Sequence, residues 1–125
     1  MILVEVYIDR SPIQGIGLFA RKPISVGTLV WKIDLRFDRL IPIADVEATS
    51  GPVRSHLDRY SYFRKGDTQH VLLEADDARF INHSDDPNTD FSEGDVAYAL
   101  RDIAAGEEIT CDYGAFHSFE LLPGR

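Results

Sequence analysis

The sequence predicts a mostly β domain built from several short strands, with little helix. Residues 2–8 place an apolar side chain at every second position, which is the period of a half-buried strand. Further short apolar runs, each bounded by glycine, proline or polar turn residues, occupy residues 18–21, 28–33, 70–74 and 96–100. Short strands punctuated by turns favour several small sheets, so we expect several short antiparallel sheets.

Two stretches of the chain share a local pattern. Residues 20–30 and 99–109 carry alanine, isoleucine and glycine at matching offsets, with a basic residue at the third position of each. Glycine supplies the positive φ that a tight turn needs. We therefore expect strand, tight turn and strand in both stretches, as a local quasi-repeat and not as a solenoid.

The β pattern lapses between about residues 38 and 66, where we expect a helical insert. Residues 44–48 and 52–60 are the plausible helices, both short. Pro52 suits a first helical turn, with Ser50 or Gly51 as the cap. The tail, residues 115–125, contains phenylalanine and leucine without a clear period.

Length and composition predict one globular domain spanning residues 1–125, with 44% hydrophobic residues. The apolar start of the chain is too short to cross a bilayer and is interrupted by Glu5, so we expect no membrane contact and a cytoplasmic protein, the nucleus remaining an alternative. The single cysteine, Cys111, excludes an internal disulfide and a cysteine-rich zinc cluster.

The net charge is −8. Such a surface repels phosphate backbones and so disfavours direct nucleic-acid binding, whereas it attracts lysine-rich segments. Acidic proteins without such a partner are nevertheless common, and charge alone leaves both interpretations open.

Two polar segments interrupt this β pattern near the C-terminus: residues 79–84 (R-F-I-N-H-S) and residues 106–114 (G-E-E-I-T-C-D-Y-G). Taken alone, Asn82 and His83 are typical of a buried polar pair satisfied by backbone groups. Zinc would need more histidine or cysteine ligands, and the acidic residues that follow lack calcium-loop spacing. The pair Gly15 and Gly17 lacks the third glycine of a dinucleotide fingerprint, and by itself indicates a hairpin turn.

These two segments resemble the signatures of SET-domain protein-lysine methyltransferases, which occur in the same order and, as here, about 30 residues apart. Residues 15–20 (G-I-G-L-F-A) resemble a third signature of that family, near the N-terminus. The resemblance covers nearly the whole chain. It implies the SET fold, in which the C-terminal part threads under a loop to form a pseudoknot.

The resemblance also implies an activity, the S-adenosylmethionine-dependent transfer of a methyl group to the side-chain amine of a lysine-bearing protein or peptide. It requires no metal. By the same resemblance Tyr113 is the catalytic residue, and the cofactor-binding residues are Gln14, Gly15, Ile16, Gly17, Asn82, His83 and Tyr113.

The chemistry of this reaction suits a tyrosine. Lysine must be presented as a neutral amine although its ordinary pKa is near 10.4, and a desolvating site lowers that pKa. The remaining task is to align nitrogen, methyl carbon and sulfur, which a Tyr113 hydroxyl can do without offering a competing nucleophile. We expect Glu108 and Asp112 to fix the strand end, and Arg79 to be solvated or salt-bridged.

Five residues are candidates for the lysine channel: Tyr60, Tyr62, Phe91, Cys111 and Phe116. Tyr60 and Tyr62 could equally be core residues. Cys111 stands where the family usually has Phe or Tyr, and Phe91 lacks a hydroxyl that some relatives carry. Without those hydroxyls no water is trapped beside the lysine nitrogen, so we expect a di- or trimethylated product.

A second hypothesis belongs to another class, a catalytically silent SET-like module that binds a lysine-rich protein segment. Cys111 and the absence of a cysteine-rich tail keep it open. In many relatives that tail covers the cofactor. Here Phe116 and Phe119, or a second subunit in a homodimer, would have to cover it instead.

Overall fold

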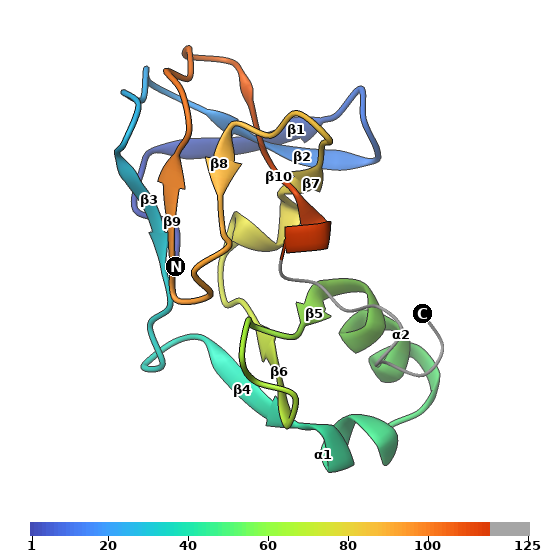
Figure 1. Ribbon diagram of the computed structural model, residues 1–125. Helices are drawn as coiled ribbons and strands as arrows, with labels where there is room; N and C mark the ends of the chain where they lie inside the picture. Colours follow the sequence, from blue (N-terminus) through green and yellow to red (C-terminus); the bar gives the residue numbers. More distant parts are fainter. Residues whose placement is uncertain (116–125) are drawn as a thin grey trace.

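The computed structural model describes residues 1–115, whose strands form three small sheets around one main hydrophobic core. Strands β1 and β2 lie at one end of the molecule, and β4, β5, β6 and the two α-helices lie at the other (Figure 1). The predicted mostly β architecture is confirmed. The expected tail falls, apart from its first residue, outside the described residues.

The first sheet has the strand order β1-β2-β10-β7. Its strands span Val6–Arg10 (β1), Ile16–Ala20 (β2), Glu108–Cys111 (β10) and Asn82–His83 (β7). Strands β1, β2 and β10 pair antiparallel, but β7 runs parallel to β10, with Asn82 opposite Thr110 and His83 opposite Cys111. We expected only antiparallel pairs. The long connection between β7 and β10 permits the parallel crossover, and this pairing joins the two polar segments.

The first strand begins at Val6 and not at residue 2 as the alternation suggested. Ile2 instead forms an isolated antiparallel bridge with Trp31, and the Leu3 amide donates to the Val30 carbonyl at 2.8 Å. The period-2 pattern therefore spans two separate pairings, because alternation shows which residues share a face but not which strand they pair with.

The second sheet has the order β3-β9-β8, with all pairs antiparallel. Its strands span Leu29–Lys32 (β3), Val96–Ala99 (β9) and Thr89–Asp90 (β8). The inward side chains of β3 and β9, among them Val30, Trp31 and Ala97, are almost fully buried in the main core.

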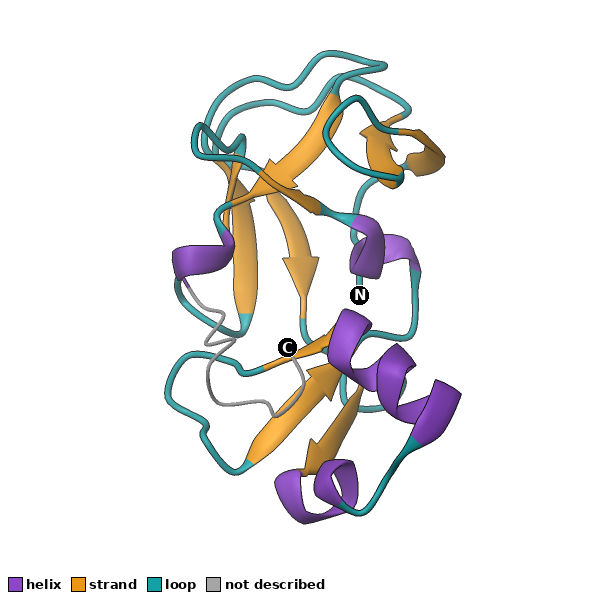
Figure 2. Cartoon of the chain, turned by 90° about the vertical axis from the view of Figure 1, so that its right-hand side faces the viewer, coloured by secondary structure: helices purple, strands orange, loops and turns teal. Residues whose placement is uncertain are grey.

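The third sheet, order β4-β6-β5, lies beside the helices. Its strands span Arg39–Pro42 (β4), His70–Leu73 (β6) and Ser61–Tyr62 (β5), and the helices span Ile43–Glu47 (α1) and Gly51–Tyr60 (α2). Figure 2 shows both helices gathered at this end of the molecule. The expected helical insert thus contains two strands as well, which pair with β6 on either side and anchor the helices to the sheet.

Ser50 occupies the cap position of α2 and Pro52 lies in its first turn, as expected, although the Ser50 side chain makes no capping hydrogen bond. A small second core of Val46, Phe63 and Val71 packs α1 against this sheet. Two short 3₁₀ turns complete the described chain, η1 at Asp77–Phe80 and η2 at Tyr113–Ala115.

The two similar stretches of the sequence pair with each other. Ile24 and Ile103 form an antiparallel bridge, the Gly27 amide donates to Ala99, and the Gly106 amide donates to Ala20. Both glycines have φ near +84° (83° and 84°), as tight turns between strands require. The quasi-repeat is therefore a pair of equivalent corners that hold the first and second sheets together.

Candidate active site

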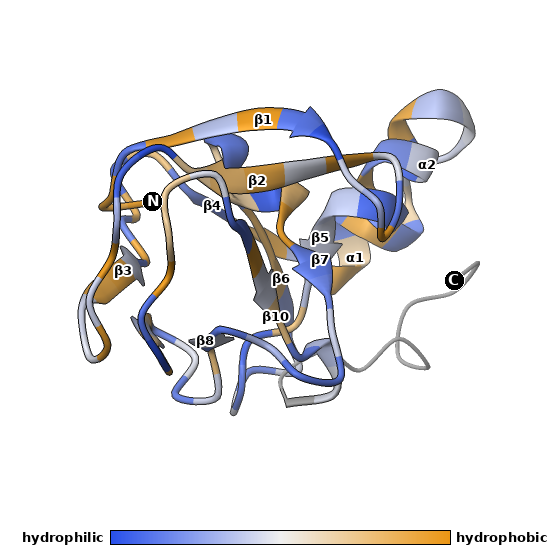
Figure 3. Cartoon of the chain, turned by 90° about the horizontal axis from the view of Figure 1, so that it is seen from above, coloured by the Kyte–Doolittle hydropathy of each residue, from blue (hydrophilic) through white to orange (hydrophobic). Residues whose placement is uncertain are grey.

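A cavity of about 400 Å³ brings the three motifs together. It lies between the β1–β2 turn, the end of α2, η1, β7 and η2, and Figure 3 shows that turn extending towards α2. Its lining residues are Gln14, Gly15, Ile16, Arg59, Tyr60, Arg79, Phe80, Asn82 and Tyr113. Five of the seven expected cofactor-binding residues are among them, and so is Tyr60.

Asn82 anchors the β1–β2 turn, which contains Gly15 and is called the glycine turn below, to the rest of the site. Its Nδ2 lies 3.1 Å from the carbonyl oxygen of Gln14, 3.2 Å from that of Ile16 and 2.9 Å from Oε2 of Glu108. Because an amide group has two N–H donors, these three acceptors share them. The Asn82 side chain therefore fixes the backbone on one wall of the cavity.

Glu108 holds the other side of this turn. Ser11 Oγ donates to the Glu108 carboxylate at 2.8 and 2.9 Å, so one carboxylate links β10, β7 and the turn before β2. A Cβ at Gly17 would lie 2.4 Å from Glu108 Oε2. Gly17 is therefore needed because Glu108 packs against it. Gly17 is itself buried and does not line the cavity, whereas Gly15 lines it with a φ of 50°.

Tyr113 enters the cavity from η2, directly after β10. Its hydroxyl donates to the Ile81 carbonyl at 2.5 Å, and its backbone amide donates to Nδ1 of His83 at 3.0 Å. The residues on either side of Asn82 thus hold both the phenol and the backbone of Tyr113. Parallel pairing of β7 with β10 is what makes this arrangement possible.

The His83 ring lies against Tyr113 and outside the set of residues that line the cavity, with ring centroids 5.4 Å apart. Its Nε2 is 2.8 Å from Oδ1 of the exposed Asp85. The sequence placed His83 among the cofactor-binding residues, which stays a prediction, and in the structure its imidazole contacts Tyr113, the expected catalytic residue.

Two arginines at the cavity were not expected there. The Arg79 guanidinium lies over the rings of Phe80 and Tyr60 at 5.1 and 5.8 Å, and Arg59 lies 5.6 Å from the Tyr60 ring. Such cation–π contacts orient both groups. For Arg79, the sequence did offer a sign of its place at the cavity, because this residue begins the R-F-I-N-H-S segment. Arg59 carries no sequence signal, because only the fold brings the end of α2 to the cavity. Arg59 and Arg79 are the charged residues among those that line the cavity, and both are positive.

Three of the expected lysine-channel residues are in the main core: Tyr62, Phe91 and Cys111, each between 2% and 8% exposed. Phe91 packs on Trp31, with ring centroids 5.2 Å apart. Burial raises the pKa of the Cys111 thiol. None of the three lines the cavity described above. Phe116 lies outside the described residues.

Tyr62 donates to a buried carboxylate, Oε1 of Glu74, at 2.6 Å. Loss of hydration raises the pKa of Glu74 to about 7, although the bond from Tyr62 opposes the shift. The sequence left Tyr62 open between a lysine-channel residue and a core residue, and it gave no role to Glu74. Tyr62 lies in β5 and Glu74 directly follows β6, and both side chains are buried.

Within residues 1–115, no group of three or more His, Cys, Asp or Glu side chains is arranged to hold a metal ion. In the same part of the chain, no helix has the length and apolar character needed to cross a membrane.

Comparisons with known proteins agree with this geometry. The family pattern of the SET domain matches residues 15–114. Histone-lysine N-methyltransferase 2D of Homo sapiens is 32% identical in an alignment of 119 residues, which covers 87% of this chain and 2% of that protein. A histone-lysine N-methyltransferase of Eremothecium gossypii, named as H3 lysine-4 specific, is 35% identical in an alignment of 116 residues, which covers 83% of this chain and 11% of that one. The chain therefore spans only a small part of these relatives.

Solved structures show the same fold. Two structures of a humanized mutant of the Chaetomium thermophilum Polycomb Repressive Complex 2, each bound to an inhibitor, superpose on this chain with TM-scores of 0.66 and 0.63. They are 23% and 26% identical to it, cover 93% and 94% of it, and are matched over 16% of their own chain. With the sequence match over most of its length and this shared fold, the chain belongs to the SET domain family.

Proposed function

We propose that this chain transfers a methyl group from S-adenosylmethionine to the side-chain amine of a lysine in a protein. The observation that carries the proposal is the convergence of the two polar segments and the glycine turn on one cavity, with Asn82 and Tyr113 both lining it. The relatives named as histone-lysine N-methyltransferases support the same chemistry.

The cavity suits the cofactor in size and in chemistry. About 400 Å³ lies within the range of small-molecule sites. The rings of Tyr60 and Phe80 offer apolar surface, and backbone groups of the glycine turn offer hydrogen bonds. Arg59 or Arg79 would pair with the carboxylate of the cofactor's methionine part. When bound, S-adenosylmethionine would supply an electrophilic methyl group on a positively charged sulfur.

The residues of the chain would act by binding and orienting. Asn82 would hold the turn at Gln14 and Ile16 in place, while Gly17 and Glu108 would support that turn from behind the cavity. The Tyr113 hydroxyl would orient the lysine nitrogen towards the methyl group. We propose a lysine-bearing partner rather than a nucleic acid, because the net charge of −8 attracts basic segments and repels phosphates.

Two measurements test the proposal. Isothermal titration with S-adenosylmethionine should detect binding, and mass spectrometry should detect methyl groups added to lysine in a mixture of basic proteins. Binding without transfer to any substrate would support the silent binding module instead. Absence of both binding and transfer would contradict the proposal.

A further inference from the structure

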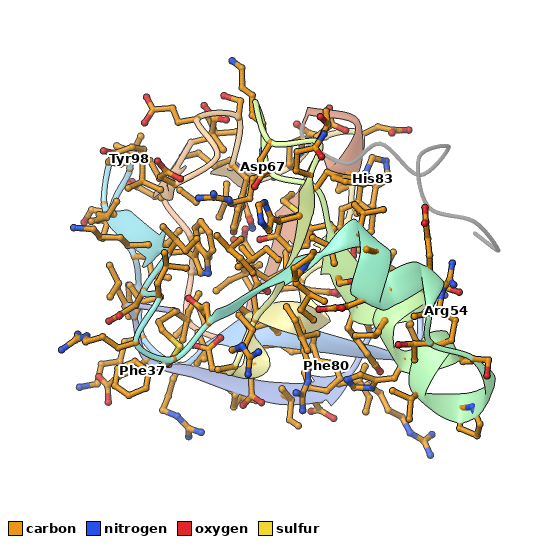
Figure 4. The ribbon with its side chains drawn as sticks, turned by 90° about the horizontal axis from the view of Figure 1, so that it is seen from below. Phe37, Arg54, Asp67, Phe80, His83 and Tyr98 are labelled. Carbon is orange, nitrogen blue, oxygen red and sulfur yellow. The ribbon has the colours of Figure 1, made fainter. Side chains whose placement is uncertain are left out.

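The hydrogen bonds of the His83 imidazole fit one tautomer of the neutral ring. Its Nδ1 is 3.0 Å from the amide nitrogen of Tyr113, which can only donate, so Nδ1 must accept and carry no proton. In the neutral ring the proton is then on Nε2, which donates to Asp85 Oδ1 at 2.8 Å. Figure 4 shows His83 beside the η2 turn that contains Tyr113.

This hydrogen bond bears directly on the position of the Tyr113 phenol. Tyr113 is half-buried and begins η2, so its backbone is set by the contacts that follow β10. The hydroxyl bond to Ile81 fixes the far end of the side chain, and the His83 bond fixes the backbone end. Loss of the second bond would remove a contact that holds the backbone end of the Tyr113 side chain.

We infer that His83 is a positioning residue for Tyr113, and that it acts only as a neutral imidazole. This inference rests on the proposed function in one respect, that Tyr113 aligns the reacting groups. A proton on Nδ1 removes the acceptor and places an N–H against the Tyr113 N–H. The protonated Nδ1 has another acceptor close by, since Asp112 Oδ1 is 3.7 Å away.

The charged groups that face the ring come from both sides of the site. Asp85 follows β7 and faces Nε2, while Asp112 precedes η2 and faces Nδ1. Asp112 Oδ1 also accepts from the Gly114 amide at 2.9 Å, so a turn of the ring towards Asp112 would disturb η2 itself.

The inference predicts a distinctive pH dependence. Methyl transfer needs a neutral lysine amine, and on this account it also needs a neutral His83. The acid limb of log kcat/KM against pH should then approach a slope of about two, where a single ionisation gives about one.

Three variants separate this role from a merely structural one. His83→Asn offers Oδ1 near the position of Nδ1 and does not titrate, and His83→Phe fills the ring volume without an acceptor. His70→Phe is the matched control, because His70 is another partly exposed histidine beside an aspartate, 3.2 Å from Asp67, on β6.

We expect His83→Phe to lower kcat by about tenfold or more, with cofactor affinity changed less than about threefold. His83→Asn should restore most of kcat and reduce the acid-limb slope to about one. His70→Phe should keep the wild-type slope. An acid limb that His83→Asn leaves unchanged would overturn the pH-dependent part of the inference.

Hydrogen exchange tests the contact without any activity. The Tyr113 amide should exchange about tenfold faster or more in His83→Phe than in the wild type, and near the wild-type rate in His83→Asn. Nitrogen-15 NMR should show that Nδ1, and not Nε2, is the unprotonated nitrogen of the neutral imidazole. Equal Tyr113 exchange in His83→Phe and wild type, or a neutral imidazole that is protonated on Nδ1, would overturn the inference even if methyl transfer is confirmed.

If His83→Phe does not fold, the wild-type protein still decides the question. A nitrogen-15 NMR titration can follow the protonation of His83 while hydrogen exchange measures the protection of the Tyr113 amide, corrected for the intrinsic exchange rate. This protection should fall as His83 becomes protonated. Protection that stays constant through the titration would contradict the inference. A wild-type protein that binds no cofactor and transfers no methyl group would contradict the proposed function alone.

Discussion

Asn82 and Tyr113 show how one residue can hold both the fold and the site. Asn82 binds backbone carbonyls of the glycine turn, and Tyr113 binds the carbonyl of Ile81, so each contributes to local structure before any ligand arrives. The sequence left two interpretations of Asn82 open, a backbone-satisfied polar pair and a cofactor contact. The contacts show the first, since the Asn82 amide donates to backbone carbonyls, and the cofactor contact stays a prediction. The backbone that Asn82 binds is a wall of the cavity.

Tyr113→Phe removes one oxygen and almost no volume, so fold and cofactor affinity should survive. We expect turnover to fall by about tenfold or more, an effect of at least about 1.4 kcal/mol on alignment. Steady-state kinetics by mass spectrometry measures it. Tyr98→Phe is the control, since Tyr98 is 38% exposed on β9. Equal turnover in wild type and Tyr113→Phe would exclude the hydroxyl from catalysis.

Asn82→Ala should weaken S-adenosylmethionine binding by about 1–3 kcal/mol, because the carbonyls of Gln14 and Ile16 lose their donor and the turn loosens. Asn88→Ala is the matched control. Its amide is 1% exposed and donates to the Glu108 carbonyl at 2.8 Å, but it does not line the cavity. Both variants should lose stability, and only Asn82→Ala should lose affinity by calorimetry. Equal affinities would remove Asn82 from the binding site.

Product multiplicity remains a prediction at the residue scale. The burial of Cys111 affects how it can be tested, because Cys111→Tyr would force a large ring into a packed core at a cost of about 1–3 kcal/mol. The wild-type protein is therefore the better test. Time-resolved mass spectrometry under excess cofactor should show di- or trimethyl-lysine, and a reaction that stops at one methyl group would contradict the expectation.

At the scale of elements, two equivalent corners join the sheets. The stretches around Gly27 and Gly106 were similar in sequence, and their similarity has a structural cause, since each corner donates a backbone hydrogen bond to the strand that begins the other stretch. The short β7–β10 pair is the other decisive element. It brings two distant segments within hydrogen-bonding distance with only two residues on each strand.

Gly27→Ala should destabilise the fold by about 1 kcal/mol through backbone strain alone. The φ of Gly27 is 83°, and an added Cβ would meet no atom within 4 Å. Denaturant unfolding measures the change. Ser25→Ala, in the same turn but without the special φ, is the control. If Gly27→Ala is as stable as wild type, positive φ does not limit this corner.

At the scale of the whole molecule, charge and burial act together. The net charge of the chain is −8, yet two carboxylate residues of the described chain, Asp38 and Glu74, are buried at the junction of the second and third sheets. Asp38 is 1% exposed and accepts from the Asp34 and Ala75 amides, while Glu74 is 4% exposed and accepts from Tyr62. Asp76 accepts from the Ile2 amide at 2.7 Å and so ties the first residues to this junction.

Stability should depend on pH through Glu74. Its pKa is raised from 4.5 to about 7 in the folded protein, so between these values the folded state holds the proton that the unfolded state has lost. The free energy of unfolding should therefore fall as pH rises through this window, by up to about 3 kcal/mol. Denaturant unfolding at several pH values should show a weaker dependence for Glu74→Gln. Parallel profiles for the two proteins would exclude Glu74 as the cause.

The sequence by itself determined the β character, most strand positions, both helices, the turn glycines and the family motifs. These depend on local periodicity, on φ requirements and on residues adjacent in the chain. The tertiary structure alone decided which side chains reach the cavity. Arg59 and Arg79 line it, whereas Gly17 and the His83 ring support it from outside, and Tyr62 is in the core. The physical reason is that these positions are set by pairing between segments far apart in the chain, for which a local pattern carries no information.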